Sequence, residues 1–301
     1  MRVESFSSLG PDGFHRIAYC DWGDAHDRHV VLCVHGLSRN ARDFDYLAKA
    51  LRRKCRVVCM DVVGRGDSEW LEDKSGYSFR TYLYDAAALI ARVTTPVPPG
   101  IFRLGRTAKL DWVGTSMGGL IGLLLAARPH SPIRRLVLND VGPFVPWDAL
   151  FRLKGQAPHG ASFKSLADAE AHLREACASF GIRSREHWRH LVRHSVDRQK
   201  DGRWALRYDP AIGRAQSQWD RELPLGAEFM RGVDVWPAWS EVRCPVLVLR
   251  GAESDVLTRA TVAEMRKRKP DVQIVEFPGV GHAPALFDPD QIAVVRKFLT
   301  K

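Results

Sequence analysis

The chain has 301 residues, of which 45% are hydrophobic, and its formal net charge is +10. This length and apolar content are enough for one domain with a single core, and no second domain is required. No apolar run reaches the roughly 18 residues of a membrane span, and the N-terminus lacks a signal-peptide pattern, so we expect a cytoplasmic protein without a membrane partner. The basic residues are dispersed, and their densest run, RKRK at 266–269, is expected at the solvated end of a helix, which argues against a nucleic-acid partner.

The cysteines favour neither a metal site nor a redox motif. Six are present without a CxxC pair, and most of them fall inside apolar runs. We therefore expect buried free thiols, no bound metal and no cofactor.

The apolar runs predict a sheet. Residues 3–8 and 14–21 flank a turn at Pro11, Asp12 and Gly13, which is typical of an antiparallel hairpin at a sheet edge. Further strand-like runs alternate with helical stretches at 30–34, 56–60, 110–113, 135–139, 245–249 and 272–277. The alternation predicts an α/β fold with a mainly parallel eight-stranded sheet and helices on both faces.

The loop that follows the run at 30–34 is a candidate oxyanion-binding loop. The backbone N–H of Leu37 is the expected donor there, and His35 is expected to hydrogen-bond the loop rather than to titrate in catalysis. Arg39 lies beside this loop, where it either binds an acidic substrate group or is a solvated loop arginine. Both interpretations of Arg39 stay open.

Residues 110–128, LDWVGTSMGGLIGLLLAAR, predict a strand, a tight turn and a helix, with Ser116 at the turn. A side chain at Gly114 or Gly118 would collide with neighbouring backbone in such a turn. This context favours a catalytic serine over a helix cap, and it makes the N–H of Met117 the second oxyanion donor. The proline-rich segment 94–109 before it predicts an extended loop.

A serine nucleophile needs a histidine base and a carboxylate that orients the histidine. His282 follows the run at 272–277 in a glycine-flanked loop and is the expected base. Asp255 follows the run at 245–249 and is the expected acid, while Asp140, at the end of RRLVLND, and Glu253 remain alternatives.

The strand pattern stops between Pro143 and about Val235, where helical, charged and aromatic segments follow. We expect residues 1–142 and 236–301 to form the catalytic core and residues 143–235 to form a helical lid after the sixth strand, the run at 135–139. Most of the tryptophans in or near this lid are expected to serve packing rather than to line a pocket. They are Trp147, Trp188, Trp204, Trp219, Trp236 and Trp239.

Five motifs in chain order resemble those of the α/β hydrolase superfamily, in its esterase and lipase-like branch. They are HGLSRN at 35–40, DVVGRGDS at 61–68, GTSMGG at 114–119, RGAESDVL at 250–257 and GVGHAP at 279–284. Relatives of this kind include carboxylesterases, enol-lactone hydrolases, carbon–carbon bond hydrolases and hydroxyalkanoate oligomer hydrolases. Serine at 116, where epoxide hydrolases and haloalkane dehalogenases carry aspartate, argues against those two chemistries.

The resemblance implies hydrolysis of a small to medium ester or lactone through Ser116, Asp255 and His282. Two alternatives remain from the sequence. One is a carbon–carbon bond hydrolase of a diketone acid, which needs an arginine for the substrate carboxylate, and the other is a ligand receptor on a hydrolase scaffold.

Overall fold

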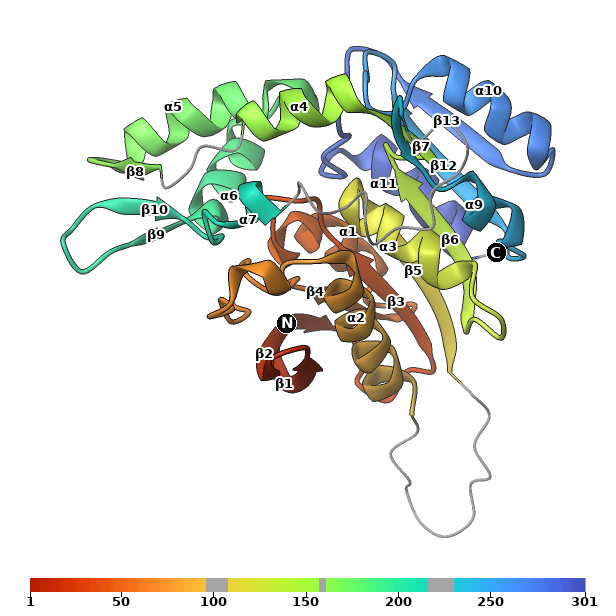
Figure 1. Ribbon diagram of the computed structural model, residues 1–301, viewed down its shortest axis with the longest axis horizontal. Coiled ribbons are helices and arrows are strands. Elements are labelled where there is room, and N and C mark those ends of the chain that lie inside the picture. Colours follow the sequence, from red (N-terminus) through yellow and green to blue (C-terminus); the bar gives the residue numbers. More distant parts are fainter. Residues whose placement is uncertain (96–107, 157–160, 216–229, 301) are drawn as a thin grey trace, which may run out of the picture.

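The computed structural model describes residues 1–95, 108–156, 161–215 and 230–300. Its centre is an eight-stranded sheet in the order β1-β2-β4-β3-β5-β6-β12-β13 (Figure 1). The strands of this sheet are β1 (Arg2–Gly10), β2 (Gly13–Trp22), β3 (His29–Val34), β4 (Arg56–Met60), β5 (Lys109–Thr115), β6 (Ile133–Asn139), β12 (Val246–Gly251) and β13 (Gln273–Phe277). The β1/β2 and β2/β4 pairs are antiparallel and the other pairs are parallel, which confirms the predicted sheet and its edge hairpin.

Helices cover both faces of the sheet because both faces of its central strands are apolar. Along β3, Val30, Leu32 and Val34 pack on one face, and Val31 and Cys33 pack on the other, as the two-residue period of a strand requires. The helical elements of this part of the chain are η1 (Ala41–Phe44), α1 (Asp45–Leu51), η2 (Lys74–Gly76), α2 (Phe79–Thr94), α3 (Met117–Ala126), α10 (Arg259–Arg268) and α11 (Pro289–Leu299). Residues of α2, α3 and α10 join the core cluster on the first face, and residues of α1 and α11 join the cluster on the second.

Residues 144–241, called the excursion below, leave the sheet after β6 and return before β12. Its elements are β7 (Phe144–Pro146), α4 (Trp147–Gln156), β8 (Ser162–Phe163), α5 (Leu166–Ala176), η3 (Ala178–Phe180), α6 (Arg185–Ser195), β9 (Val196–Arg198), β10 (Trp204–Leu206), α7 (Ile212–Ala215), β11 (Gly232–Asp234) and α9 (Trp236–Glu241). Besides the expected helices it contains short strands that we did not predict, in the sheet β8-β10-β9 and the pair β7/β11. The β7/β11 pair joins the start of the excursion to its end.

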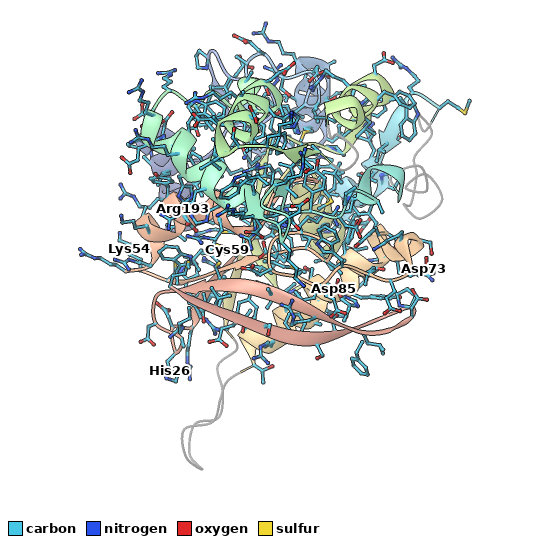
Figure 2. All side chains as sticks on the ribbon, turned by 90° about the vertical axis from the view of Figure 1, so that its left-hand side faces the viewer. His26, Lys54, Cys59, Asp73, Asp85 and Arg193 are labelled. Atoms are coloured by element: carbon cyan, nitrogen blue, oxygen red, sulfur yellow. The ribbon has the colours of Figure 1, made fainter. Side chains whose placement is uncertain are left out.

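The helices α4, α5 and α6 lie across one end of the large sheet (Figure 1). In the side view of Figure 2 the excursion forms the upper layer, and the β1–β2 hairpin lies on the opposite side of the molecule. The excursion has its own small core around Leu173, Trp188 and Leu191. The packing role predicted for the tryptophans is confirmed for Trp188, Trp236 and Trp239, which are buried in core clusters, whereas Trp219 lies outside the described residues.

Other sequence expectations can be checked against the fold. All six cysteines are free thiols, five of them buried and Cys244 half-buried. The basic run at 266–269 lies at the C-terminal end of α10, as predicted. No helix among the described residues is long and apolar enough to cross a membrane. The predicted loop at 94–109 falls mostly outside the described residues.

Candidate active site

Ser116 lies at a strained turn between β5 and α3. Its φ angle is +52°, a value that is uncommon for any residue with a side chain. A Cβ atom at Gly114 would collide with the backbone of Gly118, and one at Gly118 would collide with the carbonyl of Val34. The steric requirement predicted for both glycines is therefore confirmed, and the turn is the one expected of an exposed nucleophile.

His282 reaches Ser116 from the loop after β13. Its Nε2 lies 2.9 Å from Ser116 Oγ, within reach of the hydroxyl proton. The imidazole is almost fully buried, so bulk water does not compete for this contact. The structure thus brings together the two residues that the sequence predicted as nucleophile and base.

The carboxylate in contact with His282 belongs to Asp140. The imidazole Nδ1–H donates to Asp140 Oδ2 at 2.7 Å, which leaves Nε2 free to accept from Ser116. Asp140 is fully buried, and it also accepts the backbone N–H of Gly251 at 2.7 Å and the hydroxyl of Ser254 at 2.5 Å. Three donors around one carboxylate fix its position and orientation.

The expectation that Asp255 contacts His282 is wrong. Asp255 is half exposed and forms a two-point ion pair with Arg152 of α4, with both contacts at 2.6 Å. Burial alone would raise the pKa of this carboxyl, but the hydrogen bonds and charge of Arg152 lower it below its usual value. Asp255 therefore joins the excursion to the core.

The error has a local cause. Strands β6 and β12 are neighbours, so the residues after both strands reach the same edge of the sheet. The loop after β12 turns so that Ser254 points at Asp140, and the next residue, Asp255, points outward to Arg152. Asp140 has φ +56°, and its carboxylate is directed inward to His282. An aspartate directly after a buried strand, in a conformation that aspartate tolerates, is the signal that identifies Asp140.

Two backbone N–H groups beside Ser116 are free to bind an oxyanion. Met117 is the first residue of α3, so its N–H has no partner within the helix. In the described part of the chain neither this N–H nor that of Leu37 has a hydrogen-bond acceptor. A Cβ atom at Gly36 would lie 3.6 Å from Ser116 Cβ, which places the loop of Leu37 against Ser116.

His35 holds this loop in place, as predicted. Its Nδ1–H donates to the carbonyl of Gly36 at 2.6 Å, and its Nε2 accepts the N–H of Val62 at 3.0 Å. Complete burial lowers the pKa of His35 to about 3, so the imidazole stays neutral at physiological pH.

Arg39 is not the solvated loop arginine of the second interpretation. It is buried rather than solvated, and its guanidinium forms a two-point ion pair with Asp43, at 2.9 and 2.6 Å. Its Nη1 donates to Ser195 Oγ of α6 at 2.9 Å. The positive charge that would attract an acidic substrate group is therefore already compensated.

A cavity of about 110 Å³ lies above Ser116 and His282. Its floor comes from the core, from the loop at 36–44 and the loop of His282, and its roof comes from the excursion. The roof residues are Leu153, His172, Leu173, Ala176, Cys177, Phe180, Leu191, Leu206 and Tyr208. Most of them are apolar, and the ion pair of Arg39 and Asp43 lies in the wall between floor and roof.

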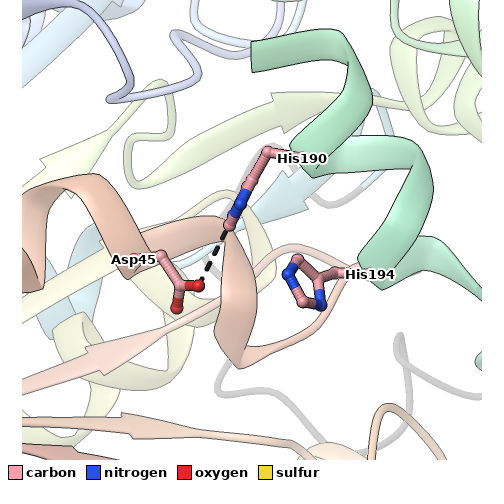
Figure 3. A group of neighbouring side chains, drawn as sticks. All are labelled: Asp45, His190 and His194. Atoms are coloured by element: carbon pink, nitrogen blue, oxygen red, sulfur yellow. Dashed lines mark ion pairs between the residues drawn. The ribbon is translucent and has the colours of Figure 1, made fainter. Parts of the chain in front are cut away.

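Asp45, His190 and His194 form a group whose nitrogen and oxygen atoms lie within 4.8 Å of one another, on α1 and α6 (Figure 3). Arg42 occupies both carboxylate oxygens of Asp45, and the Nε2–H of His190 donates to the carbonyl of Arg42 at 3.0 Å. Burial, followed by the nearby positive charge of Arg42, lowers the pKa of His194 to about 3. His190 therefore links α6 to the core through the carbonyl of Arg42 and through Asp45, which lies 3.6 Å away. The positive charge of Arg42 beside the group disfavours a divalent cation.

Comparison with known proteins places the chain among hydrolases. The model of a family described as the alpha/beta hydrolase family matches residues 31–295. A 3-hydroxybutyrate-oligomer hydrolase of Cupriavidus necator is 42% identical to the chain over 302 residues, which cover 99% of this chain and 98% of that protein. An esterase of Mycobacterium tuberculosis is 28% identical over 86% of this chain and 78% of its own length.

Solved structures of hydrolases are also similar to this chain. A protein of Rickettsia typhi described as a hydrolase superposes with a TM-score of 0.87 at 30% identity, covering 100% of this chain and 99% of that chain. An alpha/beta hydrolase of Novosphingobium aromaticivorans has a TM-score of 0.78 at 34% identity, covering 99% and 98%.

Proposed function

The chain belongs to the alpha/beta hydrolase family, and from this membership and the geometry at Ser116 we propose that it is a serine carboxylic-ester hydrolase of short hydroxyalkanoate oligomers. One observation carries the ester chemistry. Ser116, His282 and Asp140 form a continuous chain of hydrogen bonds beside two free backbone N–H groups, under a largely apolar cavity. The substrate class is carried by the 42% identity, over almost the whole of both chains, to the 3-hydroxybutyrate-oligomer hydrolase.

The first chemical step forms an acyl-enzyme. His282 Nε2 takes the proton of Ser116 as the serine oxygen attacks the ester carbonyl, and the N–H groups of Leu37 and Met117 stabilise the oxyanion. Asp140 keeps the Nδ1–H tautomer and stabilises the imidazolium that forms. The intermediate collapses when the imidazolium gives its proton to the leaving alcohol oxygen, and the carbon–oxygen bond of the ester breaks.

The second step releases the acid. A water molecule gives a proton to His282 and attacks the acyl carbonyl, and Ser116 leaves with that proton as the free hydroxyl. Neither step needs a metal ion or an organic cofactor.

The size of the cavity supports a short acyl group. An engineered cavity of about 150 Å³ holds benzene, a ligand similar in size to one hydroxybutyryl unit, so a cavity of about 110 Å³ suits a single short unit. We further propose that residues 143–235 act as the lid of this site, since the roof of the cavity comes from α4, α5, η3, α6 and β10.

The geometry gives less support to carbon–carbon bond hydrolysis. That reaction needs a positive group for the carboxylate of a diketone acid, either Arg39 or an arginine of the lid, and Asp43 compensates the charge of Arg39. A ligand receptor would turn over slowly, and the hydrolysis assay separates it from an enzyme.

The test is hydrolysis of the linear dimer and trimer of 3-hydroxybutyrate, with p-nitrophenyl esters from acetate to decanoate as a second series. We expect turnover of the oligomers and a chain-length optimum near butyrate. Ser116→Ala should lower kcat by about 10³-fold or more, whereas Ser7→Ala, on an exposed position of β1, should leave it unchanged. Hydrolysis of p-nitrophenyl esters alone would refute the substrate class, and turnover that survives in Ser116→Ala would refute the mechanism.

A further inference from the structure

The Arg39–Asp43 ion pair lies in the cavity wall, and the proposed reaction gives it no role. The Arg39 side chain is 9% exposed and that of Asp43 is 21% exposed. Removing two charges from water costs free energy, and a well-packed apolar pair is often as stable as a buried ion pair. Stability alone therefore gives no reason for this pair at the wall of a pocket that is mostly apolar.

The chemistry of the pair suits a neutral hydroxyl group. Arg39 uses Nε and Nη2 for Asp43 and one Nη1 hydrogen for Ser195, so further N–H groups on both Nη atoms remain available. Each Asp43 oxygen accepts one of these bonds and keeps a second lone pair. A hydroxyl can accept from Arg39 and donate to Asp43 at once, whereas a carboxylate would meet the negative charge of Asp43.

The pair lies close to the reacting serine. A Cβ atom at Gly36 would lie 3.6 Å from Ser116 Cβ and 3.9 Å from Arg39 Cγ, so the loop holds the arginine stem beside the nucleophile. Ser116, Arg39 and Asp43 line the same cavity. An acyl group on Ser116 therefore extends into a space whose wall carries this pair.

We propose that the Arg39–Asp43 pair binds the 3-hydroxyl group of the hydroxyacyl unit held on Ser116, so that oligomers are cleaved from the hydroxyl end, one unit at a time. In an interior unit the same oxygen is esterified, so it has no proton for Asp43. This inference rests on the proposed function, because it assumes a hydroxyacyl substrate.

The first test compares two substrates of nearly equal size, p-nitrophenyl 3-hydroxybutyrate and p-nitrophenyl 3-methylbutyrate. Hydrogen bonds to charged groups contribute about 1.5–3 kcal/mol, so the wild-type kcat/KM should favour the hydroxyl by on the order of 10- to 100-fold. The double variant Arg39→Met with Asp43→Asn removes both charges together and leaves no unpaired buried charge. In this variant the ratio of kcat/KM for the two esters should fall to about 1, while the variant still hydrolyses the 3-methylbutyrate ester.

The neighbouring Arg42–Asp45 pair provides a matched control. It has the same chemistry, lies on the same segment, and does not line the cavity. Arg42→Met with Asp45→Asn should therefore keep the preference for the hydroxyl. Loss of the preference in this control as well would overturn the assignment to Arg39 and Asp43, as would its persistence in the first double variant.

A second measurement needs no variant. The wild-type enzyme should cleave a dimer whose carboxyl end is a methyl ester about as well as the free dimer, and should lose activity on a dimer whose 3-hydroxyl is methylated. The opposite result would show that the pair binds the carboxylate end and would overturn the proposal.

The two substrate series separate this inference from the proposed function. If oligomers are not cleaved but p-nitrophenyl 3-hydroxybutyrate is still preferred, the proposed function fails and the hydroxyl recognition stands. If oligomers are cleaved without any preference, the hydroxyl recognition fails alone.

Discussion

The floor and the roof of the cavity are built from different parts of the chain and held in different ways. In the floor, the backbone of the reactive residues is tied to the sheet, since the N–H of Ser116 donates to the carbonyl of Asn139 at 3.0 Å and that of Asp140 to the carbonyl of Leu249 at 2.8 Å. The roof consists mainly of apolar side chains on short helices that are attached to the core by ion pairs and hydrogen bonds. We therefore expect changes in the floor to affect the proposed chemistry most, and changes in the roof to affect mainly how well acyl groups of different length fit.

The largest expected effect comes from comparing two aspartates, Asp140 in the floor and Asp255 at the attachment of the roof, each replaced by asparagine. Asp140→Asn should lower kcat by about 10²- to 10⁴-fold, because an amide favours the wrong tautomer of His282 and does not stabilise its charged form. Asp255→Asn should cost less than about threefold, because an exposed ion pair with Arg152 contributes little. Steady-state kinetics with p-nitrophenyl butyrate measure both effects, and a larger loss in Asp255→Asn would restore the original sequence prediction.

A change in the roof should alter substrate range without abolishing catalysis. Ala176 of α5 lines the cavity, and Ala176→Leu should lower kcat/KM for the butyrate ester by about tenfold, since overpacking costs on the order of 1–3 kcal/mol. The acetate ester should change by less than about threefold. Ala171→Leu, on an exposed position of the same helix, serves as the control. Equal losses for both esters would show that the roof takes part in the chemistry.

The attachment of the roof should depend on pH. Asp209 accepts hydrogen bonds from Lys74 and Tyr77 of the core, each at 2.7 Å. Burial alone would raise its pKa, but these hydrogen bonds lower it below 3.8. A lowered folded-state pKa gives stability that is present above the unfolded pKa and lost as pH falls through the folded value.

Asp209→Asn should therefore destabilise the protein by about 1–3 kcal/mol at pH 7, and the difference from the wild type should shrink below about pH 4. Thermal unfolding between pH 3 and pH 7 measures it, and protease cleavage within residues 196–212 would report loosening of this segment. A difference in Tm that does not vary with pH would show that the carboxylate is not the cause.

The sequence was enough for the sheet and for the pair Ser116 and His282. Strands buried on both faces leave a continuous apolar run, and the elbow needs glycines at fixed positions, so both features are local in the sequence. The choice between Asp140 and Asp255 was not local. It depended on the path of the loop after β12, which directs Ser254 toward Asp140. Asp255 instead pairs with Arg152, which lies more than 100 positions away in the chain.

The same limit applied to Arg39. Its partner Asp43 lies four residues away, but nothing in the sequence showed that Arg39 would be buried and would donate to Ser195 of α6. The short strands of the excursion were also missed. Two- and three-residue strands carry too little periodicity to be recognised, and tertiary contacts decide whether they form.

The pairing of β7 with β11 has a consequence for how such enzymes diversify. Because the two ends of the excursion lie side by side on adjacent strands, the whole segment between them can be lengthened, shortened or exchanged without moving β6 or β12. A mutation in this segment can therefore change which substrates fit while the residues of the core stay in place. Recombination between relatives at residues 146 and 232 would exchange the roof of the cavity as a unit and leave Arg39 and Asp43 in place.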